Sequence, residues 1–160
     1  MSMPTESPAY QIHRHLMNNW AEATTGTTKD DIQFMRGPYD SKVPTPQLCV
    51  WDGAIWHSEM GLGQSAKNYD ETHQILIGVY VQVTSKTSLN DAKLQKWRMI
   101  REIMRIIRVE IAAEVAGTST LTDFEGMKLA PAWSPDDRYN ESPIRLGHRC
   151  TIFVNYQVTS

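Results

Sequence analysis

The chain has 160 residues, a length that fits one domain with a sizeable hydrophobic core. Its 41% hydrophobic and 21% charged residues are ordinary values for a globular protein. Lys and Arg number 16 and Asp and Glu 18, and the formal charge of -2 excludes long-range attraction to nucleic acid or an anionic membrane. We therefore expect a single domain over residues 1–160, and any contact with DNA would have to be local.

The first expected element is a helix from about residue 8 to residue 24. Ser7 followed by Pro8 is typical of an N-cap and a first helical position. The apolar residues of this segment recur at helical spacing, at Ile12, Leu16 and Trp20. Gly26 lies in a polar stretch that stops the helix.

The next segments carry weaker signals. Residues 31–36 predict a short strand, and the prolines after them predict an irregular loop. Residues 47–56 are apolar enough for a strand structure, and the dipeptide Asp52-Gly53 in their middle is typical of a hairpin turn.

The clearest signal is a strand over residues 72–84 followed by the longest helix, about residues 91–115. One face of the strand is apolar, with Ile75, Ile77, Val79, Val81 and Val83 at every second position. Ser88 is placed to cap the helix and Gly117 to end it. The helix has an apolar stripe at spacings of three and four, which we expect to pack on the strand: Trp97, Ile100, Met104, Ile107, Ile111 and Val115.

The last third of the chain adds more strands. Residues 124–133 predict a strand, residues 134–143 a projecting loop, and the alternating residues 148–158 a long final strand. This order predicts an α+β fold with a mainly antiparallel sheet and two helices, about 8–24 and 91–115, packed on one face.

Four arginines run beside the apolar stripe of the long helix: Arg98, Arg101, Arg105 and Arg108. One interpretation is a solvated helix edge whose side chains cover apolar surface. The other is a contact surface, because arginine pairs with carboxylates through forked, partly desolvated hydrogen bonds. These four arginines are our candidate subunit interface, and DNA phosphate is the rival partner.

Two loops are candidate contact sites for partner molecules. The first contains Gly61 and Gly63, and the second contains Asp136, Asp137 and Glu141. The acidic residues lack the spacing and the glycine of a calcium loop. They are candidate mates for the arginines of a neighbouring copy.

The sequence has no motif for catalysis, a cofactor or a metal, such as a nucleophile elbow, phosphate loop or dinucleotide fingerprint. His13 and His15 are two residues apart on a helix, where side chains do not face each other. His148 and Cys150 supply two of the three or four ligands that zinc needs. Cys49 lies, like Cys150, in an apolar run, which favours two buried free thiols over a disulfide. We expect a protein that is not an enzyme and uses no cofactor.

In layout the chain resembles the tail terminator (tail completion) proteins of long-tailed bacteriophages and related archaeal tailed viruses. The resemblance covers nearly the whole chain and rests on the order of the elements rather than on a strict motif. These elements are the first helix, a proline-rich approach to the strand 47–51, the strand 74–83, the helix 91–115 and the final strand 149–158.

The resemblance implies a subunit that forms a ring, expected to contain six copies, which caps the finished tail tube and stops its polymerisation. The ring would offer a platform for head-tail joining. The implied partners are further copies, the tail tube protein, the head-tail connector or stopper protein, and DNA that passes through without sequence recognition. The implied location is the tail or neck of the virion, after assembly in the host cytoplasm and without a membrane.

Three alternatives stay open on the sequence. Another neck or head-tail connector protein of similar fold would have the same order of elements. A small nucleic-acid-binding α+β module would use the arginines on phosphates and Tyr80 or Trp56 as stacking platforms. A cytoplasmic ligand-binding domain would need a concave apolar pocket.

Overall fold

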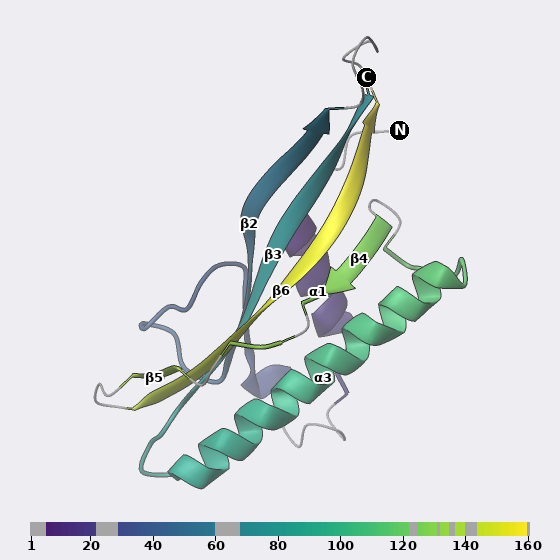
Figure 1. Ribbon diagram of the computed structural model, residues 1–160. Helices are drawn as coiled ribbons and strands as arrows, with labels where there is room; N and C mark the ends of the chain where they lie inside the picture. Colours follow the sequence, from purple (N-terminus) through teal and green to yellow (C-terminus); the bar gives the residue numbers. More distant parts are fainter. Residues whose placement is uncertain are drawn as a thin grey trace.

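The computed structural model describes residues 6–21, 29–59, 68–121, 125–130, 132–134, 137–139 and 144–159. The elements follow in the order α1 (Pro8–Asn19), a short 3-10 turn η1 (Lys29–Asp31), β1 (Gln33–Met35), β2 (Gln47–Glu59), β3 (Asn68–Gln82), α3 (Leu89–Val115), β4 (Glu125–Leu129), β5 (Asp137–Tyr139) and β6 (Arg145–Thr159). The predicted α+β fold is confirmed, with two helices packed against a mostly antiparallel sheet (Figure 1). None of the described helices is long and apolar enough to cross a membrane.

The long strands β2, β3 and β6 form the centre of the sheet. The strand order is β1-β2-β3-β6-β4, and β5 pairs with β6 as well. β1 runs parallel to β2, and every other pairing is antiparallel. The ends of β2, β3 and β6 near the C terminus reach beyond both helices (Figure 1). The sheet is therefore covered by helices over only part of its length.

The local signals at the helix ends are confirmed. Ser7 Oγ accepts the backbone N–H of Tyr10 at 3.2 Å, and Ser88 Oγ accepts that of Asp91 at 3.2 Å. Gly117, just after α3, has a φ of 74°, a left-handed conformation that glycine adopts without steric cost.

The predicted face of β3 forms the centre of the hydrophobic core. Ile75, Ile77 and Val79 are fully buried on the side of the sheet that carries the helices. The stripe of α1 joins them as expected, with Ile12, Leu16 and Trp20 buried.

The buried side of α3 differs from the predicted stripe. Ile100 and Ile107 are buried, but Trp97 is 52% and Val115 is 87% exposed. Met104 and Ile111 are only partly buried. The core is filled instead by Ala92, Met99, Ile103 and Ile106. Because α3 carries apolar residues on more than one side, their spacing alone could not decide which side faces the sheet.

The predicted turn at Asp52-Gly53 is wrong, because β2 continues through it to Glu59. The register between β2 and β3 shifts at a β-bulge between Asp52 and Ile55. At the bulge, the side-chain oxygen of Gln74 on β3 accepts the backbone N–H of Ala54 at 3.0 Å. The carboxylate of Asp52 accepts the backbone N–H of Ala9 at 3.3 Å, which joins this point of the strand to the first turn of α1.

Two further boundaries need correction. α1 ends at Asn19 rather than near residue 24, because the backbone of Trp20 is in an extended conformation. The ring of Trp20 packs edge-on against the ring of Phe34, with the two ring centroids 5.7 Å apart. The segment 134–143 is not entirely a loop, because Asp137 begins β5, which pairs with β6.

The prediction of two buried free thiols is confirmed for Cys49 and Cys150. Burial raises the pKa of the Cys49 thiol to about 12, and it also raises the pKa of Cys150. Both side chains therefore stay in the unreactive thiol form at neutral pH.

Candidate subunit interface

The side of α3 that points away from the sheet is open to solvent, and we call it the outer face of α3. It consists of Leu94, Trp97, Arg98, Arg101, Arg105, Arg108 and Val109, with Met104 at its border. Steps of three, four and seven residues return to the same side of a helix, so these side chains are neighbours. The apolar members Leu94 and Val109 are 41% and 57% exposed. Grouped exposed apolar side chains of this kind mark contact surfaces.

A shallow open depression lies on the outer face of α3. Its volume is about 370 Å³, and it is lined by Arg101, Met104, Arg105, Arg108 and Val109. The lining combines guanidinium groups with apolar surface, so an occupant would contact both.

The acidic residues of α3 only partly neutralise this face, through the exposed Asp91 near its first turn and through Glu102, which pairs with Arg105. Beyond Asp91 in the first turn, the acids of the helix are Glu102, Glu110 and Glu114. Glu102 is fully buried and accepts the backbone N–H of Ala21 at 3.0 Å. Glu114 accepts backbone N–H groups at the start of β4. The outer face is therefore cationic, although the whole chain has a formal charge of -2.

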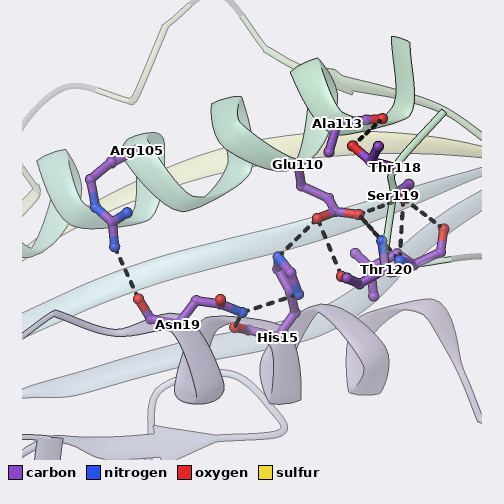
Figure 2. Close-up of polar contacts among 9 residues, drawn as sticks. His15, Asn19, Arg105, Glu110, Ala113, Thr118, Ser119 and Thr120 are labelled. Carbon is purple, nitrogen blue, oxygen red and sulfur yellow. Dashed lines mark hydrogen bonds and ion pairs between the residues drawn. The ribbon is translucent and has the colours of Figure 1, made fainter. Parts of the chain in front are cut away.

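The four predicted interface arginines do not have equal roles. Arg105 binds the buried carboxylate of Glu102 through a forked ion pair, and its guanidinium donates to the carbonyl oxygen of Asn19 at 3.0 Å. Figure 2 shows this contact between α3 and the last residue of α1. The hydrogen bonds that Arg105 donates to Glu102 raise the pKa of Arg105. Arg105 thus joins the two helices of its own subunit, a role that its spacing in the sequence did not reveal.

The other three arginines remain available for a partner. The guanidinium of Arg101 lies over the ring of Trp97 at 4.9 Å, a cation–π contact on the open surface. Arg98 and Arg108 are exposed and make no ion pair with any side chain that the structure describes.

The predicted contact loops fall mostly outside the described residues. Gly61, Gly63, Asp136 and Glu141 are among those whose structure is not described, and Asp137 is described only as the first residue of β5. Their pairing with the arginines of a neighbouring copy stays a prediction.

The sheet has a second open surface, on the side opposite to the helices. We call it the bare sheet face and define it by Trp51, Trp56, Leu76 and Phe153. Trp51 is directly opposite Leu76 in the register, and the rings of Trp56 and Phe153 are 6.0 Å apart. Both described helices pack on the other side of the sheet.

One end of this side of the sheet is covered, which removes a predicted stacking platform. Tyr80 is only 6% exposed, because the ring of Tyr39, from the segment before β2, packs on its ring. The two ring centroids are 5.1 Å apart. Arg145 in turn lies over Tyr39 at 3.8 Å. Tyr80 therefore cannot stack on a nucleic acid base, whereas Trp56 is open.

A buried polar cluster holds the segment after α3 against both helices (Figure 2). Glu110 accepts the hydroxyl of Ser119 and the backbone N–H groups of Thr120 and Leu121 at 3.0 and 3.2 Å. His15 of α1 lies 3.5 Å away from the same carboxylate. Desolvation would raise the pKa of Glu110, but these hydrogen bonds and His15 outweigh it and lower that pKa. The pKa of His15 is lowered by burial, which the charge of Glu110 only partly offsets.

The lowered pKa of His15 predicts a loss of stability on mild acidification. The unfolded state binds a proton below its pKa of 6.5, while the folded state holds the imidazole neutral to lower pH. The free energy of unfolding should therefore fall as the pH drops below about 6.5. Glu110, whose pKa is lowered from 4.5, adds a second loss at lower pH. Urea denaturation at pH 7.5 and at pH 5.5 measures the first loss.

The matched control for this prediction is His15→Gln, which removes the titrating group and keeps a polar side chain. The other histidines contribute equally to both proteins, so the variant should lose less stability between the two pH values than the wild type. Equal losses in both proteins would contradict the assignment to His15.

The residues weighed as metal ligands have other surroundings. A ring nitrogen of His13 is 2.9 Å from the carbonyl oxygen of Phe34, whereas His15 faces Glu110. The described part of the chain has no group of three or more His, Cys, Asp and Glu side chains arranged to hold a metal ion. Comparison of the sequence with models of known protein families and with curated proteins finds no match.

Proposed function

We propose that this protein is a ring-forming structural protein of a viral tail or neck, of the tail terminator kind. The ring, of about six copies as the resemblance implies, would cap the tail tube, end its polymerisation and provide the platform for head-tail joining. Its partners would be further copies of itself, the tail tube protein and the head-tail connector, with DNA passing through without sequence recognition. The observation that carries the proposal is the outer face of α3.

The composition of this face supports a contact with protein. Interface cores are enriched in aromatic residues, methionine and arginine, and poor in acidic residues and lysine. The outer face of α3 has this composition, with Trp97, Met104 and the arginines beside one another. Apolar side chains that contact only water do not stabilise a protein, so a purely solvated helix edge does not explain the exposed Trp97 and Val109. Tryptophan and arginine are also the residues that most often dominate binding energy.

The second candidate function, a nucleic-acid-binding module, is less well supported. Tyr80 is covered, and the remaining platform, Trp56, lies on the side of the sheet opposite to the helices. The arginines lie on the outer side of α3. Phosphate contacts by the arginines and base stacking on Trp56 would therefore occur on opposite sides of the molecule, and the ring beside the arginines, Trp97, is covered on one face by Arg101.

The test is a charge reversal on the outer face of α3, with Arg101→Glu and Arg108→Glu combined. Arg105 is left unchanged because of its bonds to Glu102 and Asn19. The wild type is expected to assemble into rings, seen by light scattering after size-exclusion chromatography and by negative-stain electron microscopy. The variant should remain folded and monomeric, because the introduced carboxylates cannot make the forked and stacking contacts of the guanidinium groups that they replace.

The matched control is Lys42→Glu with Lys86→Glu, two exposed loop residues whose replacement changes the net charge by the same amount. This control should assemble as the wild type does. Wild-type protein that stays monomeric and binds DNA in a salt-dependent way, with binding lost in the outer-face variant, would favour the nucleic-acid alternative. A variant that assembles normally would show that the outer face of α3 is solvated.

A further inference from the structure

We infer that copies of this chain join head to tail, with the outer face of α3 of one copy docked on the bare sheet face of the next. The inference rests on the proposed ring and names the two surfaces that would meet. It depends on three features of the fold, which are the positions of the two surfaces, their chemistry and their charge.

The first feature is position. α3 packs on one side of the sheet through Met99, Ile103 and Ile106, so its outer face points away from the sheet on that side. The bare sheet face, with Trp51 and Trp56, points the opposite way. A closed ring needs two different surfaces on each subunit, arranged so that one copy meets the next. This chain has two different open surfaces, and the rotation between successive copies would decide whether the assembly closes.

The second feature is chemistry. The bare sheet face offers the ring of Trp56, which is 48% exposed, next to the half-buried side chains of Trp51, Leu76 and Phe153. Leu94, Trp97 and Val109 would pack on it, as helices pack on sheets within domains. Guanidinium groups stack favourably on aromatic faces. The rings of Trp56 and Phe153 are groups of the bare sheet face that the arginines would meet.

The third feature is charge, which disfavours the simplest alternative. A two-fold contact of the outer face of α3 with itself would place Arg98, Arg101 and Arg108 opposite the same arginines of the second copy. On the bare sheet face, the cations Arg149 and Lys128 lie toward the β6 and β4 side. The docked helix would therefore centre on the β2 side, at Trp51 and Trp56.

The experiment mixes two variants that each lack one surface. The first is Arg101→Glu with Arg108→Glu, and the second is Trp56→Thr, which removes an exposed ring from the bare sheet face. Each variant alone should assemble at least about tenfold more weakly than the wild type, as expected for central interface residues. A one-to-one mixture should form dimers, because the intact helix face of the second variant meets the intact sheet face of the first. Growth should stop there, because the other pair of surfaces is altered on both sides.

The control for Trp56→Thr is Ile55→Thr. Ile55 is its neighbour on β2 and is 50% exposed, but it pairs with His73, which in turn pairs with Val154, on the helix-bearing side of the sheet. This control should assemble like the wild type. Circular dichroism of each variant checks that the fold is kept.

The outcomes separate this inference from the proposed function. If the Trp56→Thr variant assembles alone, the helix faces pair with each other or with another surface, and the inference is wrong. If the arginine variant assembles alone, the sheet faces pair with each other, and the inference is again wrong. A wild-type protein that forms no ring would overturn both the inference and the proposed function.

Discussion

Replacing Ile103 by alanine is expected to lower the free energy of unfolding by about 2–5 kcal/mol. Ile103 is fully buried between α3 and the sheet, so the change removes packed atoms and leaves a cavity. The matched change on the other side of the same helix is Trp97→Ala. The Trp97 side chain is half-exposed, and its loss should change the stability of the monomer by no more than about 0.5 kcal/mol.

Urea denaturation followed by circular dichroism measures both values. The same Trp97→Ala variant should weaken assembly, because it removes the largest apolar side chain of the outer face of α3. A large loss of stability for Trp97→Ala with little effect for Ile103→Ala would mean that α3 packs with the side predicted from its spacing.

The second large effect concerns Arg105. The change Arg105→Ala should destabilise the monomer by about 1–3 kcal/mol, because the buried carboxylate of Glu102 loses its charged donor. Among the partners that the structure describes, Glu102 would keep the backbone N–H of Ala21, and the carbonyl of Asn19 would lose the guanidinium of Arg105. Arg101→Ala, four residues earlier on the exposed side, should change stability by less than about 0.5 kcal/mol.

A double-mutant cycle tests the physical reason. Combining Arg105→Ala with Glu102→Gln removes the unpaired buried charge, so the double variant should recover part of the stability lost by Arg105→Ala alone. Denaturant midpoints of the four proteins give the coupling energy. If the two substitutions change the free energy of unfolding additively, the ion pair between Arg105 and Glu102 contributes nothing to stability. If Arg101→Ala and Arg105→Ala change the free energy of unfolding equally, both arginines are merely exposed.

The division of roles among the arginines matters for the interface. The sequence shows a row of residues with the same spacing, whereas the structure divides it into Arg105, which connects α1 and α3, and three residues that face outward. An assembly variant that included Arg105 would mix a loss of stability with a loss of contact. The charge reversal at Arg101 and Arg108 avoids this.

Local signals in the sequence by themselves determined the fold class and much of the core. The alternation in β3 assigned Ile75, Ile77 and Val79 to one face, because successive side chains of a strand point to opposite sides. Ser7 and Ser88 marked the helix starts, because a hydroxyl that accepts a backbone N–H acts within one turn. These features depend on neighbours in the chain, so the sequence contains all the information they need.

Only the tertiary structure decided which side of α3 is buried, how far β2 runs and what Arg105 does. α3 has apolar residues on several sides, and the choice between Trp97 and Ile103 depends on the shape of the sheet and of α1, which α3 must fit. The Asp52-Gly53 dipeptide favours a turn locally, but pairing with β3 along the whole strand outweighs that preference. Arg105 lies 86 residues from Asn19 in the chain, and no spacing rule connects the two. These outcomes are set by contacts between distant segments, which have no local pattern in the sequence.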